Sequence, residues 1–71
     1  MDINSKKKTL AKQIERVNNS FMRCKEVGQE ELALKWLNMA QGLEDAFKIV
    51  FGQKYIDYWM EEIEAETIHK A

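Results

Sequence analysis

The sequence predicts an all-α fold, in which an antiparallel helical hairpin and a third helix form an up-down-up three-helix bundle. The 71 residues include no proline and only three glycines, so little in the chain interrupts a helix. Apolar residues recur at helical spacing in three stretches. Connections of two or three residues separate the stretches, which places consecutive helices antiparallel. We therefore expect one small helical domain over 1–71, with helices over about 5–27, 30–51 and 54–69, which oligomerisation could complete.

The first predicted helix has a clear apolar side. Asn4 or Ser5 can cap its start, because a short side-chain oxygen accepts hydrogen bonds from the free amides of the first turn. Its apolar residues follow at spacings of four and three, which predicts a face packed along another helix. These residues are Leu10, Ile14, Val17, Phe21 and Cys24. Gly28 follows, where a left-handed residue would end the helix.

The second predicted helix begins near Glu30 and Glu31, whose charges suit the positive end of the helix dipole, and Gly52 ends it. Its apolar residues share an arc of about 120°, which we interpret as the core-facing side. They are Leu32, Trp36, Met39, Ala40, Leu43, Ala46, Phe47 and Val50. The third helix has a similar apolar side, made of Ile56, Trp59, Met60, Ile63 and Thr67. Trp36 and Trp59 are expected to anchor the core.

Some apolar residues fall outside these core-facing sides. They are Leu34, Leu37, Ile49, Tyr58 and Ile68. A chain of about 70 residues has a small core, so leaving these side chains in water would cost much of its stability. We expect them to bind a second copy, as a homodimer or higher oligomer, or another protein.

Charge is unevenly distributed, although the net charge is −1. Residues 1–25 hold seven basic and two acidic side chains. Four of the basic residues lie within about 80° of one another, opposite the apolar side of the first helix, and form what we call the basic ridge. The basic ridge consists of Lys8, Lys12, Arg16 and Arg23. Three interpretations stay open: a solvated face, contact with an acidic partner protein, or contact with nucleic-acid phosphates.

The third helix carries an acidic face formed by Asp57, Glu61 and Glu64. Its charge complements the basic first helix, within or between chains. We expect no catalytic residue, metal ligand or cofactor, because the sequence lacks the motifs of phosphate loops, zinc proteases and serine hydrolases. His69 has no second ligand at metal-binding spacing, and Cys24 belongs to the apolar side of the first helix.

The opening of the sequence lacks the apolar stretch of a signal peptide, and apolar runs are short, as in Ile49-Val50-Phe51. A bilayer-spanning helix needs roughly 20 apolar residues. We therefore expect a cytoplasmic protein with no membrane contact.

Residues 21–40 resemble the turn and second helix of a tetratricopeptide hairpin, with Gly28 at the turn and Ala33 and Ala40 at small-residue positions. This resemblance implies a tight αα-hairpin. The lysine-rich opening and helical build of the whole chain also look like small uncharacterised proteins of phages and mobile elements of Gram-positive bacteria. That resemblance implies a regulator or inhibitor acting on another protein.

The functional prediction is a non-enzymatic protein-interaction module, regulatory or inhibitory, with a protein partner. The alternative is a nucleic-acid-binding regulator that uses the basic ridge. Against the alternative stand the net charge of −1 and the lack of a helix-turn-helix or basic-zipper pattern.

Overall fold

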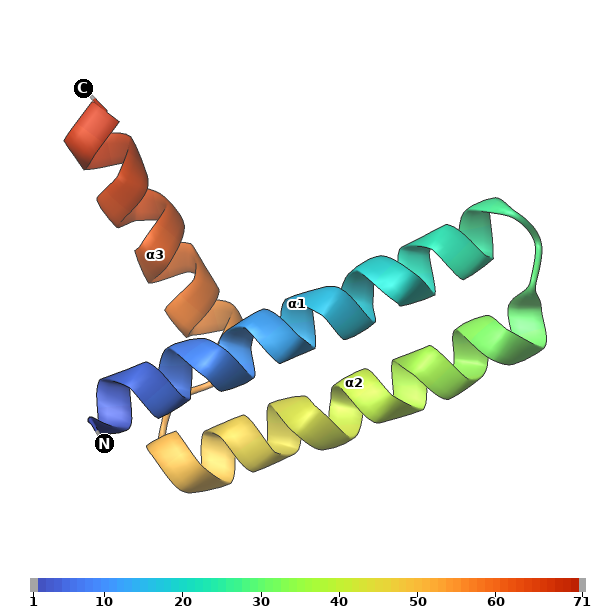
Figure 1. The fold of residues 1–71 in the computed structure, drawn as a ribbon, viewed down its shortest axis with the longest axis horizontal. Coiled ribbons are helices and arrows are strands. Elements are labelled where there is room, and N and C mark those ends of the chain that lie inside the picture. Colours follow the sequence, from blue (N-terminus) through green and yellow to red (C-terminus); the bar gives the residue numbers. More distant parts are fainter. Residues whose placement is uncertain (1, 71) are drawn as a thin grey trace.

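The computed structural model describes residues 2–70, and the side chains of residues 2–67. It contains three helices, α1 (Ile3–Glu26), α2 (Glu30–Phe51) and α3 (Tyr55–Lys70) (Figure 1). The all-α prediction is confirmed, and the observed helix ends lie within two residues of the predicted ones. The first cap is Asp2 rather than Asn4 or Ser5: its side chain accepts a hydrogen bond of 3.2 Å from the backbone amide of Asn4.

A tight turn joins α1 to α2. Gly28 has a φ of +77°, the left-handed conformation that glycine adopts without strain. The amide of Gln29 donates to the carbonyl of Cys24 at 2.9 Å, and the amide of Gly28 donates to the carbonyl of Lys25 at 3.2 Å. This is the Schellman pattern that ends a helix, and it turns α2 back along α1.

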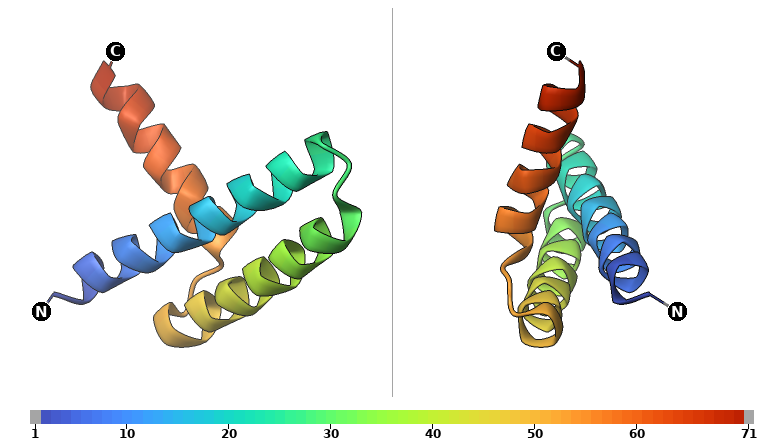
Figure 2. Two further views of the ribbon diagram at one scale, coloured as in Figure 1. Left: turned by 45° about the vertical axis from the view of Figure 1, so that its right-hand side comes forward. Right: turned by 90° about the vertical axis from the view of Figure 1, so that its left-hand side faces the viewer.

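The α1–α2 hairpin contains most of the core. Ile14, Val17 and Cys24 of α1 are buried, as their spacing predicts. The buried residues of α2 are Ala33, Ala40 and Phe47, which recur every seven residues and therefore lie on one side of the helix. Two alanines on that side let the helix backbones approach closely. Figures 1 and 2 show α1 and α2 side by side and antiparallel along their length.

The observed core-facing side of α2 is turned relative to the predicted one. Leu32, Met39 and Val50 were expected in the core, but they are 43%, 50% and 63% exposed. The reason is that α2 packs closely against one helix only. A single neighbour covers a narrow strip, here the one with Ala33, Ala40 and Phe47, and the rest of the broad apolar arc stays more open to solvent.

The third helix crosses the hairpin instead of lying along it (Figures 1 and 2). Gly52, with a φ of +68°, ends α2, and residues 53–54 lead directly into α3. The Tyr55 ring meets Phe47 edge-on, with 5.9 Å between ring centres, and Tyr58 lies 5.5 Å from Phe47. The start of α3 therefore packs into the core with Ala11 and Ile14, and the rest of the helix projects past α1.

A polar link also joins α3 to the hairpin. The Nζ atom of Lys7 donates to Oε1 of Gln53 at 2.7 Å, and Nε2 of Gln53 donates to Glu61 at 3.0 Å. The same Nζ atom lies 5.0 Å from the centre of the Tyr58 ring and 5.9 Å from that of Phe47, both within cation–π range. Lys7 thus joins the beginning of α1 to the α2–α3 connection and to α3.

Candidate interaction surfaces

An apolar stripe runs along the full length of α2, beside the residues that face α1. Its members follow at spacings of 4, 3, 4, 3 and 4, the pattern of a helix that packs on another helix. We call it the outer stripe: Leu32, Trp36, Met39, Leu43, Ala46 and Val50. Leu32, Met39 and Val50 are exposed, and the other members are half-buried. The hairpin therefore leaves a helix-packing surface open.

The outer stripe lies on the face of the hairpin opposite α3. On α2, the buried Ala33, Ala40 and Phe47 separate two flanks. One flank carries Glu44 and Lys48, which line a cleft with the start of α3. The outer stripe is the other flank. In the right-hand view of Figure 2, α3 stands to one side of the α1–α2 pair.

The apolar side of α3 is a second open surface. Ile56, Trp59, Met60 and Ile63 are between 41% and 52% exposed, so Trp59 is not the core anchor expected from its position. The anchors are instead Tyr55, which is buried, and Tyr58, which is half-buried. The reason is that α3 crosses the hairpin. Its first turn therefore packs on the hairpin, and its apolar side does not.

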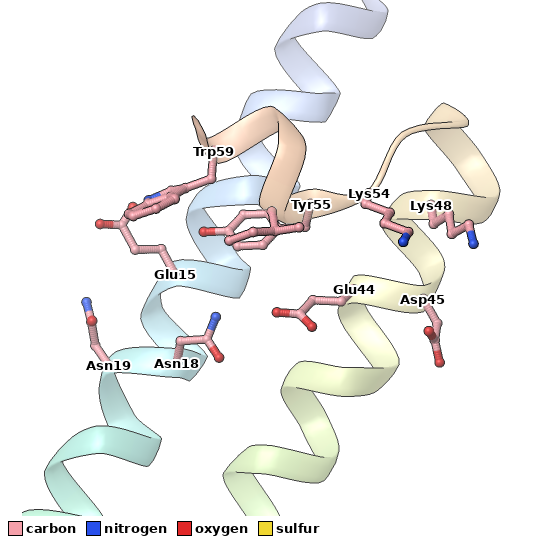
Figure 3. Close-up of a pocket in the computed structure, with 10 residues that line it drawn as sticks. Glu15, Asn18, Asn19, Glu44, Asp45, Lys48, Lys54, Tyr55 and Trp59 are labelled. Atoms are coloured by element: carbon pink, nitrogen blue, oxygen red, sulfur yellow. The ribbon is translucent and has the colours of Figure 1, made fainter. Parts of the chain in front are cut away.

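An open cleft of about 550 Å³ lies between the start of α3 and the hairpin (Figure 3). Charged, polar and aromatic side chains line it. From the hairpin come Glu15, Asn18 and Asn19 of α1 and Glu44, Asp45 and Lys48 of α2. The α2–α3 connection and α3 contribute Lys54, Tyr55, Ile56 and Trp59. Burial raises the pKa of Tyr55 above its ordinary value, and the nearby Glu15 and Glu44 carboxylates raise it further. Burial also raises the pKa of Tyr58, and the nearby Glu62 carboxylate raises it further.

The four residues of the basic ridge are all exposed. Lys8 and Lys12 line a hollow beside α3 together with Glu62 and Glu66. Basic side chains of α1 and acidic side chains of α3 thus line the same hollow, and the acidic ones are Glu62 and Glu66. Asp57, Glu61 and Glu64 are exposed, and Glu61 bonds to Gln53.

The five apolar residues predicted to form an interface lie in different environments. Leu34 and Ile49 are 57% and 82% exposed, and Leu37 is half-buried. Tyr58 is half-buried, because its ring packs on Phe47 at the edge of the core cluster. The side chain of Ile68 lies outside the described residues. The outer stripe could have been predicted from its 4-3-4-3-4 spacing. The predicted arc was broader and did not separate the stripe from the buried residues.

Among the described side chains of residues 2–67, no three metal-ligating groups come together. Within residues 2–70, no helix is long and apolar enough to cross a membrane. The chain matches no protein-family model, no curated protein and no solved structure.

Proposed function

We propose that the chain is a non-enzymatic protein-interaction module that regulates or inhibits another protein, and that α3 is its binding helix. The observation that supports this proposal is the exposed apolar side of α3. Ile56, Met60 and Ile63 recur at spacings of four and three, and all three are open to solvent although the start of the helix is fixed in the core. Helices that bind in a groove of a partner insert apolar side chains at this spacing.

The charges of α3 indicate the kind of partner. Exposed Asp57, Glu61 and Glu64 accompany the apolar side, so a groove with basic residues at its rim would complement it. The link through Lys7 and Gln53 holds α3 in a defined orientation before binding. A pre-ordered helix loses less conformational entropy when it binds, which favours affinity.

The biological setting follows from resemblance alone. The likeness of the chain to small helical proteins of phages and mobile elements of Gram-positive bacteria supports a regulator or inhibitor that acts in the cytoplasm. The partner in this proposal is a host or phage protein.

Co-purification from the native host, with partners identified by mass spectrometry, tests this proposal. The tagged chain should recover a protein that is lost with Met60→Gln, a variant that removes an exposed apolar contact and keeps a good helix former. Leu34→Gln is the matched control, since Leu34 is 57% and Met60 52% exposed. Recovery of the same proteins with wild type and Met60→Gln would contradict binding through α3.

A second candidate function is nucleic-acid binding through the basic ridge. Its support is the exposure of all four ridge residues. The placement of Glu62 and Glu66 beside Lys8 and Lys12 weakens it, because carboxylates repel phosphates. Binding to mixed DNA or RNA that falls steeply with salt, and that Arg16→Ala and Arg23→Ala weaken, would favour this alternative.

A further inference from the structure

We infer that the outer stripe of α2 binds α2 of a second copy of this chain, in an antiparallel homodimer. This inference does not rest on the proposed function, because the outer stripe lies on the face of the hairpin opposite α3. The two surfaces can be altered separately, and one copy can use both at once.

The exposed surface area of the single chain is larger than that of a compact monomer, as expected for a chain that binds a partner. A compact monomer of this mass exposes about 4,600 Å², whereas this chain exposes 5765 Å². Its radius of gyration is 13.8 Å, compared with about 11 Å for a compact chain of its length. The excess, about 1,200 Å² by this scaling, is larger than the roughly 800 Å² that each partner contributes to an interface of standard size. Part of the excess belongs to α3, which projects from the hairpin, and the exposed outer stripe accounts for another part.

The pattern of α2 shows which face that neighbour covers. The outer stripe has the spacing of a two-helix contact and extends from Leu32 to Val50. The first turn of α3 packs on the other flank of α2, beside Glu44 and Lys48, so within the described part of the chain the fold itself leaves the outer stripe open. A second copy is a suitable occupant, because it presents the same stripe and two-fold symmetry makes one stripe complementary to the other.

An antiparallel pairing centred between Met39 and Leu43 matches large side chains with smaller or equal ones. Met39 then meets Leu43 of the second copy, and Trp36 meets Ala46. Gly42 lies beside the outer stripe, and this register places it next to Gly42 of the second copy, close to the two-fold axis. A Cβ atom built at Gly42 meets nothing within 4 Å in the single chain, so no contact inside the chain uses this gap. Two facing glycines let the two backbones approach closely.

The same register accounts for the most exposed large apolar residue. Ile49 is 82% exposed. It follows Lys35 and Gly42 at intervals of seven residues, so the three lie in one row beside the outer stripe. In the antiparallel pair Ile49 lies beside the aliphatic part of Lys35 of the second copy, whose ammonium group reaches water. The neighbouring flank of α1 carries the uncharged Gln13 and Ser20 along its middle and Lys6 near its start. This dimer thus covers Ile49 without burying a charge at the centre.

Sedimentation equilibrium of the full chain tests the inference. At about 100 μM the wild type should have twice the chain mass of 8.4 kDa. Met39→Glu should raise the dissociation constant at least about tenfold, because it places a carboxylate in an apolar contact. Leu34→Glu should leave the constant unchanged. The sequence placed Leu34 at an interface, but in this dimer it lies on the side of α2 away from the outer stripe. A wild-type monomer, or equal effects of the two variants, would overturn the inference.

Cross-linking gives a second measurement that does not depend on a disruptive substitution. Gly42→Cys should be joined into a covalent dimer by a short bis-maleimide, since the two copies meet at this residue. Leu34→Cys, the control, should not be joined, and it also measures any reaction of the buried Cys24. Equal yields from the two variants would contradict the antiparallel register. Met39→Glu should retain the partner bound through α3, and Met60→Gln should still dimerise, so the two proposals fail independently.

Discussion

The ammonium nitrogen of Lys7 lies 5.0 Å from the centre of the Tyr58 ring, and these two residues join the beginning of α1 to α3. Lys7 also donates a hydrogen bond of 2.7 Å to Gln53, in the connection between α2 and α3. A single lysine thus contacts both the helix that crosses the hairpin and the segment that leads into it. Together with the packing of Tyr55 and Tyr58 on Phe47, these contacts hold α3 and its apolar side in one orientation.

Replacing Lys7 with methionine should destabilise the fold by about 1–2 kcal/mol, because it removes a cation–π contact and a charged hydrogen bond but keeps the apolar bulk. Thermal unfolding followed by circular dichroism measures the loss. Hydrogen exchange should show faster exchange in α3 than in α1 and α2, since α3 loses an attachment. The control is Lys8→Met at an exposed neighbouring position, which should change stability by less than about 0.5 kcal/mol. Equal effects at the two lysines would show that the position of Lys7 is unimportant.

Phe47 is the residue on which the three helices depend most. It is fully buried, and its ring lies 5.0 Å from that of Phe51 and 5.9 Å from that of Tyr55. Phe47→Ala should cost about 3–5 kcal/mol, comparable to the whole stability of so small a domain. Circular dichroism of the variant should show a largely unfolded chain at room temperature. Phe47→Leu keeps part of the volume and should remain folded, with a lower melting temperature; a cooperative, wild-type-like transition in Phe47→Ala would contradict this assignment of the core.

The turn between α1 and α2 depends on the left-handed conformation of Gly28. Alanine at this position should reduce the free energy of unfolding by about 1 kcal/mol, because its Cβ atom disfavours a positive φ. Asparagine tolerates the left-handed region better, so Gly28→Asn should cost less than Gly28→Ala. Urea unfolding of the three proteins gives the order, and a loss with asparagine as large as that with alanine would argue against the Schellman turn.

Stability should fall in alkaline solution because of the buried tyrosine. Burial, then the charges of Glu15 and Glu44, raises the pKa of Tyr55 in the folded chain above 10.0, its ordinary value. Above that pH the unfolded chain releases the phenolic proton more readily than the folded chain, so ionisation favours unfolding. The stabilising contribution is fully present below pH 10 and is lost as the pH rises through the folded pKa. Thermal unfolding between about pH 8 and 11 should therefore show a smaller decrease for Tyr55→Phe than for the wild type.

The helices could be predicted from the sequence because their signals are local. Gly28 and Gly52 occupy the left-handed positions at which α1 and α2 end, and the spacing from Leu10 to Cys24 predicts the packed side of α1. The direction of α3 could not be predicted in this way. It depends on how Tyr55 and Tyr58 pack around Phe47 and on the reach of Lys7, and these contacts join distant parts of the chain.

The interaction surfaces were harder to predict for a related reason. The apolar arc of α2 was predicted as a whole, but periodicity does not tell which part of an arc a neighbour covers. The structure divides it: Ala40 and Phe47 are buried, and Leu32, Met39 and Val50 are open. The basic ridge was predicted to be exposed opposite the apolar side of α1, and it is. Its proximity to Glu62 and Glu66 follows from the crossing angle of α3, which no local pattern contains.

The link between Lys7 and Gln53, residues that lie 46 positions apart, also has a consequence for the order of folding. The hairpin closes over the short turn around Gly28, so its contacts near the turn form at a small entropic cost. The contacts of Lys7 with Gln53 and Tyr58 require α1 and α2 to be paired along their whole length first. We therefore expect the hairpin to form early and α3 to dock last. The most easily released part of the chain during native fluctuations would then be the helix that carries the proposed binding surface.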